Sequence, residues 1–379
     1  MKENVLERME RIDAKTKIQQ FMAKEAMPYD FKVKYAATRA REFIRECDIR
    51  DLNTHVSVGG LDSIVLFLFL RSIGIKVPGI SVSFLEDVSI QKVHTELGIE
   101  KLKPSVHHYR ENGAPVYWNK PMVIQEFGFP VLSKEIAAKI ELLQNPTEKN
   151  KTVRHAIITG ETGEYGGFQT DSRMKLAQIW LELFGGYENE TEGVHYRIPP
   201  FKVSSRCCYY LKEKPCDDWA KEHNSVPFLG LMASEGGRRA KSLRVNGCNY
   251  FGTSVIRSAP FAIFHRQDIL QLALDLKAPV PAIYGEIVRD EDGTLRTTKA
   301  QRTGCNMCGF GIHMEARPHR FDLLRERNEK EWEYWMYRCC TDPETGETFG
   351  WGRVLDYIGV GWENPWDTGC VDQIPMEGF

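Results

Sequence analysis

A glycine pair between two apolar segments constrains the fold of this chain more than any other feature. Residues 54–58 are rich in β-formers, Gly59 and Gly60 follow, and an apolar helix is predicted from there to a point before Gly74. Residues 79–84 (GISVSF) then predict a second buried strand. Strand, helix and strand in this order form a βαβ unit with a right-handed crossover. The sequence therefore predicts an α/β fold, a parallel twisted sheet with flanking helices.

Beyond this unit, the spacing of apolar residues predicts further elements. Residues 1–50 have helical spacing and predict a helical lead-in. The other predicted elements are a helix over 133–143 capped by Ser133, strands over 155–159 and 226–231, a helix over 267–276 and a hairpin turn at 290–293. We therefore expect three consecutive segments: the lead-in (1–50), an α/β domain (51–300) and a C-terminal segment with a tail (301–379).

Composition and charge exclude several classes of protein. The chain has 379 residues, of which 42% are hydrophobic and 27% charged, as in ordinary globular proteins. Its formal charge of -2 gives no whole-chain attraction for nucleic acid or membranes. The longest apolar run, residues 64–70, is shorter than the roughly 20 residues of a membrane span. The first twenty residues lack an apolar signal core, so we expect a cytoplasmic protein.

The glycine turn, residues 58–63 (VGGLDS), is the first candidate binding site. Without a Cβ, Gly59 and Gly60 let the backbone come close to a ligand, and the amides at the start of a helix attract an anion. Phosphate or sulfate is therefore the expected ligand, and a tight turn without a ligand is the alternative. The candidate nucleotide-binding residues of this region are Ser57, Gly59, Gly60, Asp62 and Ser63.

Four of the ten cysteines are grouped: Cys207 and Cys208 are adjacent, and Cys305 and Cys308 form a Cys-x-x-Cys turn. In a reducing compartment such groups favour metal or redox chemistry over disulfide bonds. Four thiolates suit a 4Fe-4S cluster or a structural zinc ion, and the adjacent pair favours the cluster, whose iron corners are well separated. The alternative is that Cys207 and Cys208 are small buried hydrophobic residues.

A third candidate site follows the strand predicted over 226–231. Residues 234–239 (SEGGRR) place two arginines beside two glycines at a strand end, where ligands of open α/β sheets gather. Paired guanidinium hydrogen bonds could hold a sulfate or phosphate, and a solvated surface pair is the alternative. The candidate residues are Ser234, Glu235, Arg238 and Arg239, with Arg302 and His313 as weaker ones.

These motifs, in this order, resemble the phosphoadenosine phosphosulfate reductase family of the PP-loop, or adenine nucleotide alpha hydrolase, superfamily. The match rests on VGGLDS (58–63) against the PP-loop pattern SGGxDS, on RCC (206–208) and on TGCNMCGFGIHME (303–315). It covers about residues 50–361. The resemblance implies a PP-loop nucleotide-binding domain over 51–300 and a cluster-binding segment over 301–379, with a 4Fe-4S cluster held by Cys207, Cys208, Cys305 and Cys308.

Two departures from the family pattern bear on the activity. ATP-cleaving members carry Lys and Ser where this chain has Leu61 and Val58, which disfavours ATP cleavage. The reductases carry a Glu-Cys-Gly-Leu-His segment near the C-terminus, which this chain lacks. Cys370, close to the C-terminus, is the candidate nucleophile instead.

The resemblance implies an oxidoreductase that reduces an adenylyl sulfate nucleotide to sulfite, with a thioredoxin-like protein as a reductant. ATP-dependent transfer of sulfur to tRNA or DNA is one alternative, and the only one that involves nucleic acid. A non-catalytic nucleotide-binding protein is the other. The aromatic side chains of the tail predict packing rather than a base-stacking platform: Trp332, Tyr334, Trp335, Tyr337, Trp351, Trp362 and Trp366.

Overall fold

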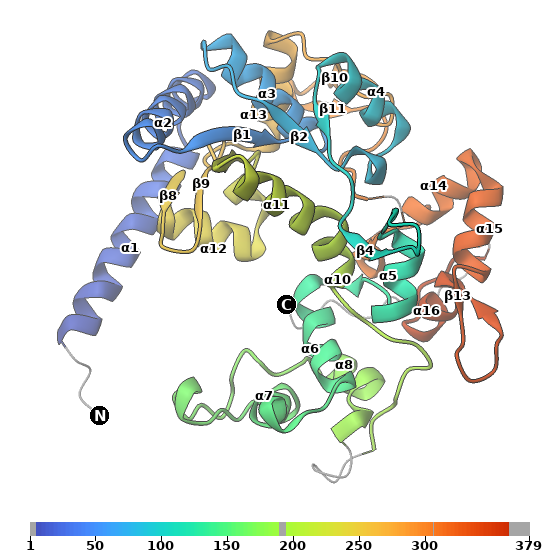
Figure 1. The fold of residues 1–379 in the computed structure, drawn as a ribbon. Coiled ribbons are helices and arrows are strands. Elements are labelled where there is room, and N and C mark those ends of the chain that lie inside the picture. The colour runs from blue at the N-terminus through green and yellow to red at the C-terminus, as the bar shows by residue number, and fades with distance from the viewer. Residues whose placement is uncertain (1–4, 189–194, 306, 364–379) are drawn as a thin grey trace. The chain divides into compact units, whose positions relative to one another are not determined.

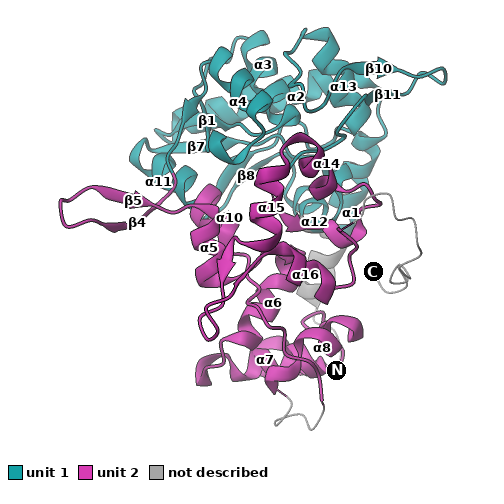
Figure 2. Cartoon of the chain, turned by 90° about the vertical axis from the view of Figure 1, so that its right-hand side faces the viewer, with its two compact units in different colours: residues 1–103, 214–306 teal, residues 104–213, 307–379 magenta. Residues whose placement is uncertain are grey.

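The computed structural model describes residues 5–188, 195–305 and 307–363 of the chain. The chain forms two compact units, each made of two separate stretches (Figure 2): residues 1–103 and 214–306 form unit 1, and residues 104–213 and 307–379 form unit 2. These boundaries differ from the three consecutive segments expected at 1–50, 51–300 and 301–379. Local patterns along a sequence do not record which distant stretches pack together, so the interleaving of the two units leaves no signal in them.

Unit 1 contains a sheet and the helices that flank it. Its helices are α1 (Val5–Glu25), α2 (Tyr29–Ile49), α3 (Leu61–Ser72), α4 (Val88–Glu96), α11 (Lys214–Glu222), α12 (Gly237–Asn246) and α13 (Arg266–Asp275). Its strands are β1 (Asn53–Ser57), β2 (Gly79–Ser81), β3 (Glu100–Lys101), β7 (Ser225–Phe228), β8 (Asn249–Phe251), β9 (Ile256–Ser258) and the hairpin β10 (Ile287–Arg289) and β11 (Leu295–Thr297). The predicted helical lead-in and α/β class are confirmed.

The main sheet of unit 1 is mixed and mostly parallel, with the strand order β3-β2-β1-β7-β9-β8. Figure 1 labels β1, β2, β8 and β9 of this sheet. Only β8 runs antiparallel to its neighbour. Strand β1 pairs in parallel with β2 on one side and β7 on the other, so that Val56 lies opposite both Gly79 and Phe228. The chain proceeds outward from β1 through β2 to β3, and later outward in the other direction from β7. The winding therefore reverses between β1 and β7.

Aromatic side chains hold the helices of unit 1 on this sheet. Phe43 of α2 is fully buried and packs edge-on against Phe228, with ring centroids 4.9 Å apart. Phe69 of α3 lies 5.4 Å from Phe261, and α3 contacts both β1 and α13. Burying one such side chain stabilises a fold by roughly 1.5–3 kcal/mol. This packing fixes the start of α3, and with it the glycine turn, at the end of β1.

Unit 2 is mostly helical. Its helices are α5 (Lys120–Phe127), α6 (Lys134–Gln144), α7 (Lys151–Thr159), α8 (Gln178–Phe184), α10 (Arg206–Cys208), α14 (Arg320–Arg327), α15 (Glu329–Tyr337) and α16 (Trp351–Tyr357). Three strand pairs complete it: β4 (Val106–Tyr109) with β5 (Pro115–Tyr117), β6 (Val131–Leu132) with β12 (Gly309–Phe310), and β13 (Cys340–Thr341) with β14 (Thr348–Phe349).

The aromatic tail contributes to the core of unit 2. Trp332, Trp335, Trp351 and Trp362 are buried, and Trp351 packs edge-on against Phe129 at 5.0 Å. The predicted packing role is therefore confirmed for these four. Tyr334 and Tyr337 are partly exposed, at 39% and 47%. Trp366 lies outside the described residues.

Several local predictions can be compared with the structure. Helix α6 begins after Ser133, whose side chain accepts a hydrogen bond from the Ile136 amide at 3.1 Å, as predicted. Helix α13 and the β10–β11 hairpin also confirm their predictions. The predicted strand at 155–159 is wrong, because these residues form the second half of α7. The strands predicted at 79–84 and 226–231 end early, at Ser81 and Phe228.

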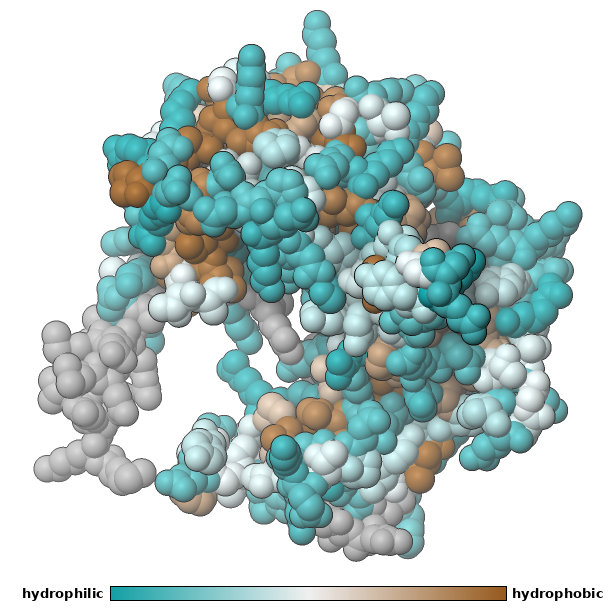
Figure 3. Space-filling model, in the orientation of Figure 1, coloured by the Kyte–Doolittle hydropathy of each residue, from teal (hydrophilic) through white to brown (hydrophobic). Residues whose placement is uncertain are grey.

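The surface agrees with the composition. Figure 3 shows one face of the chain, on which hydrophilic residues predominate among the coloured parts. Within the described residues, none of the helices combines the length and the apolar character needed to cross a membrane.

Candidate functional site

The glycine turn is folded by its own side chains. Gly60 is the N-cap of α3, and Asp62 and Ser63 lie inside the first turn of the helix. Ser63 instead reaches back: its hydroxyl accepts from the Gly59 amide at 2.7 Å and donates to the Gly60 carbonyl at 2.8 Å. A Cβ on Gly60 would collide with the Tyr284 hydroxyl and lie 3.0 Å from Thr303 Oγ1. Only glycine fits there without displacing these groups.

The amino end of α3 offers backbone donors. The Leu61 amide donates to the Tyr284 hydroxyl at 3.0 Å. The amides of Gly60 and Asp62 have no acceptor among the described residues. Free amides at the positive end of a helix form a binding site for an anion. The turn thus has the two donors that a phosphate or sulfate group would need.

A buried histidine of α4 supports the glycine turn. His94 of α4 is fully buried, and its Nε2 lies 2.8 Å from the Gly59 carbonyl oxygen. A carbonyl can only accept, so Nε2 carries a proton, and in the neutral ring Nδ1 accepts from the Ser83 hydroxyl at 2.9 Å. Ser83 follows β2 in a short 3-10 turn. The loop after β2 therefore fixes the carbonyl of the glycine turn through His94.

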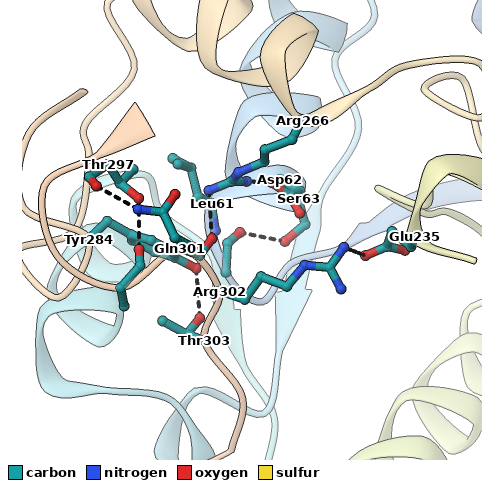
Figure 4. A network of polar contacts seen from close by, with 12 residues as sticks. Leu61, Asp62, Ser63, Glu235, Arg266, Tyr284, Thr297, Gln301, Arg302 and Thr303 are labelled. Carbon is teal, nitrogen blue, oxygen red and sulfur yellow. Dashed lines mark hydrogen bonds and ion pairs between the residues drawn. The ribbon is translucent and has the colours of Figure 1, made fainter. Parts of the chain in front are cut away.

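Charged side chains surround Asp62, as Figure 4 shows. Asp62 forms an ion pair with Arg266, and Arg266 Nη2 also donates to the Gln301 carbonyl at 3.0 Å. Glu235 lies 2.8 Å from Arg239 and 3.5 Å from Arg302. Burial raises the pKa of the Asp62 carboxyl above its ordinary value; Arg266 and Arg302 oppose this rise, and Glu235 adds to it. A carboxyl with a perturbed pKa beside free amides is typical of a functional site.

The structure brings the segment after β7 to the same place. A Cβ on Gly230 would lie 3.1 Å from the Ser63 amide, so this segment packs directly on the glycine turn. Ser234 donates its hydroxyl hydrogen to the Phe264 carbonyl at 2.9 Å, and Arg239 is engaged by Glu235. The Arg238 side chain is not among the described parts of the chain.

The turn lies where ligands bind in many α/β proteins. Ser57 is the last residue of β1, and Gly59 and Gly60 follow it at the carboxyl end of the strand. The segment after β7 leaves the neighbouring strand at the same edge, because the two strands are parallel. The winding of the sheet reverses between these two strands. Open α/β sheets bind ligands outside the carboxyl ends of the strands at such a reversal.

The predicted cluster cysteines are distributed over both units. Cys207 and Cys208 end α10 in unit 2, Cys308 precedes β12 in unit 2, and Cys305 belongs to unit 1. A π-helical turn (Tyr209–Glu213) follows the adjacent pair, and such turns are frequent at functional sites. The left-handed φ of Met307, +52°, shapes the Cys-x-x-Cys turn.

A cation stands beside the adjacent pair. Burial alone would lower the pKa of Lys134, but the Cys208 sulfur and the Glu213 carboxylate favour its charged form and raise the pKa. Lys134 lies 2.8 Å from Glu213. An ammonium beside a thiol favours the thiolate, the form that binds metal. This environment fits the expected ligand role of Cys208.

The described cysteines are all free thiols, and they differ in burial. Within the described residues all nine cysteines lie outside disulfide bonds, and no group of three or more His, Cys, Asp or Glu side chains is arranged around a metal position. Cys339 and Cys340 are buried, and hydrogen bonding between them together with burial strongly raises the pKa of the Cys339 thiol. Cys370, the candidate nucleophile, lies outside the described residues.

His313, the weaker candidate near the Cys-x-x-Cys turn, is a partly buried histidine. Burial lowers the pKa of His313, whose Nδ1 has no partner within the described chain.

Four residues of the site were not predicted from the sequence: His94, Arg266, Tyr284 and Thr303. Each contacts the turn, or its partner, from a distant position; Tyr284 and Leu61 are 223 residues apart. Only Thr303 lies within a recognised motif, as the first residue of TGCNMCGFGIHME (303–315), two residues before Cys305. The comparisons add no further evidence, because no protein-family model matches the chain and no curated protein is significantly similar to it.

Proposed function

We propose that the chain is a nucleotide-binding enzyme of the sulfonucleotide reductase type, with an adenine nucleotide bound at the glycine turn. The observation that carries the proposal is the pair of amides, Gly60 and Asp62, that have no acceptor among the described residues and lie at the amino end of α3, where the winding of the sheet reverses. The phosphate or sulfate of the nucleotide would accept hydrogen bonds from these amides. The proposal requires that the α/β architecture of unit 1 is a PP-loop fold.

Reduction is favoured over ATP cleavage by the surroundings of Leu61. The Leu61 side chain is 1% exposed and packs in the hydrophobic core, so it leaves no cation at this position. Two nearby arginines are already engaged, Arg266 by Asp62 and Arg302 by Glu235. A leaving pyrophosphate needs cationic contacts, and losing one can lower a rate by orders of magnitude.

The proposed reaction balances as a thiol-dependent two-electron reduction. The thiolate of Cys370 attacks the sulfur of the adenylyl sulfate, the bond from that sulfur to the bridging phosphate oxygen breaks, and AMP leaves. The sulfonate group remains on the cysteine sulfur. A thiolate of a thioredoxin-like dithiol then attacks the cysteine sulfur and releases sulfite; its second thiol resolves the mixed disulfide. The dithiol supplies both electrons.

The four grouped cysteines would hold a 4Fe-4S cluster in this enzyme. Cys207, Cys208, Cys305 and Cys308 are the proposed ligands, supported by their paired spacing in the sequence and by Lys134 beside Cys208.

The experiment measures sulfite and pyrophosphate separately under anaerobic conditions. The protein receives adenylyl sulfate, its 3'-phosphorylated form or ATP, together with a dithiol reductant. We expect sulfite from one of the sulfated nucleotides, and none from the Cys370→Ser variant. Cys216→Ser is the matched control. Pyrophosphate without sulfite would favour ATP-dependent sulfur transfer, and tight binding without either product would favour a non-catalytic nucleotide-binding protein.

A further inference from the structure

Three consecutive residues just before the Cys-x-x-Cys turn, 301–303, contact the surroundings of the glycine turn. The Gln301 carbonyl accepts from Arg266, the partner of Asp62. The next residue, Arg302, pairs with Glu235 at 3.5 Å. Thr303 Oγ1 lies 2.6 Å from the Tyr284 hydroxyl. All of these residues belong to unit 1, and Cys305 follows two positions later.

Tyr284 links Thr303 to Leu61 at the amino end of α3, and Figure 4 shows these residues close to one another. Its side chain is 3% exposed, and its hydroxyl accepts the Leu61 amide hydrogen at 3.0 Å while sharing a hydrogen bond with Thr303. Burial raises the pKa of this phenol, which Thr303 and Leu61 oppose, so the hydroxyl stays protonated at neutral pH. One buried group thus joins the first amide of α3 to the segment that leads to Cys305.

We propose that Tyr284 is a positioning residue that fixes residues 301–305 to the amino end of α3, so that occupation of the glycine turn is transmitted to the position of Cys305. The ligand in this statement rests on the proposed function; the hydrogen-bonded link does not. Two sites joined through one rigid element influence each other reciprocally. Nucleotide binding at the turn therefore restrains the backbone next to Cys305.

A residue that merely fills the core would behave differently. Tyr284→Phe keeps the ring and its packing, and removes only the hydroxyl. Loss of the Tyr284 hydroxyl leaves both the Leu61 amide and the Thr303 hydroxyl without this hydrogen-bond partner. Thr303→Val breaks the link at one end and leaves the Leu61 bond in place. A positioning role predicts distinct patterns for the two variants, whereas a general loosening of unit 1 predicts the same pattern for both.

Amide hydrogen exchange of the full-length protein, read by mass spectrometry, tests the link without any activity. Without ligand, Tyr284→Phe should speed exchange roughly tenfold at Leu61 and at residues 301–305, the effect expected for one lost buried hydrogen bond. Thr303→Val should speed exchange at 301–305 and leave Leu61 unchanged. Tyr357→Phe is the matched control, because it removes a hydroxyl that donates to the Leu183 carbonyl in unit 2.

The second arm adds adenosine 5'-phosphosulfate, with AMP and ATP in parallel. In the wild type the nucleotide should slow exchange at residues 58–64 and at 301–305. In Tyr284→Phe it should slow exchange at 58–64 alone. Equal slowing at 301–305 in both proteins, or uniformly faster exchange across unit 1 in the ligand-free variants, would overturn the proposal. If no nucleotide affects residues 58–64, the proposed function fails, and the ligand-free arm still decides the role of Tyr284.

Discussion

The stability of unit 1 should fall between neutral pH and pH 5 because of one histidine on the strand that carries the glycine turn. His55 of β1 is 1% exposed, and its Nδ1 lies 2.8 Å from Ser225 Oγ on β7. The ring also packs edge-on against Trp219 at 5.2 Å. Burial, together with the nearby charge of His223, lowers the pKa of His55 from 6.5 to about 4.

The sign of the effect follows from which state binds the proton. Below pH 6.5 the unfolded chain protonates this histidine, whereas the folded chain keeps it neutral down to about pH 4. The contribution of His55 to the free energy of unfolding is therefore fully present above pH 6.5 and declines as the pH falls toward 4. At 1.36 kcal/mol per pKa unit, the loss between pH 7 and pH 5 is about 2 kcal/mol.

Urea unfolding followed by circular dichroism at pH 7 and pH 5 measures this loss. His55→Asn removes the titrating ring, so the variant should lose about 2 kcal/mol less than the wild type over the same pH interval. The two proteins are compared only in the change of their free energy of unfolding between pH 7 and pH 5. A constant effect of the altered packing cancels in this change. An equal pH dependence in both proteins would refute the buried, neutral state of His55 and the interior position of β1.

Three further outcomes test other parts of the molecule. Gly128→Ala should destabilise unit 2 by about 2 kcal/mol or more, because the φ of Gly128 is +114° and a Cβ would collide with the Lys202 backbone; an unchanged Tm would contradict this. Arg154→Gln should lower the free energy of unfolding by about 3 kcal/mol, since it leaves the buried Glu188 unpaired, whereas the exposed Arg296→Gln should change little. Anaerobically purified protein should contain about four irons per chain, and each of Cys207→Ser, Cys208→Ser, Cys305→Ser and Cys308→Ser should lower that content; stoichiometric zinc without iron would contradict the cluster.

The βαβ unit could be predicted because its signals are local. An apolar run between Gly60 and Gly74 has the length of a helix, and β-branched residues on either side favour strands. The prediction at 155–159 was wrong because a short apolar run (HAIIT) has no periodicity that separates a strand from a buried helix. Gly160, with a left-handed φ of +86° at the C-cap of α7, was the signal that pointed to a helix.

The candidate site could be predicted only where a motif carries it. The glycine turn and the segment around Glu235 were predicted separately, and their meeting follows from the pairing of β1 with β7. Arg266 and Tyr284 could not be predicted, because a side chain contributed from a distant loop leaves no periodic pattern near the turn it contacts. Such contacts form only in the packed fold, and no local pattern of the sequence indicates them.

The central claim is that an adenine nucleotide binds at the glycine turn, and equilibrium binding of adenosine 5'-phosphosulfate tests it most directly. Calorimetry would compare the wild type with Gly60→Ala, whose added methyl group collides with the Tyr284 hydroxyl beside the free amides. Gly163→Ala is the control, because its Cβ would lie 3.5 Å from Thr152, an ordinary contact. We predict binding by the wild type and the control, and affinity at least about tenfold weaker for Gly60→Ala. Equal affinity in all three proteins, or no binding by folded wild type, would contradict the account.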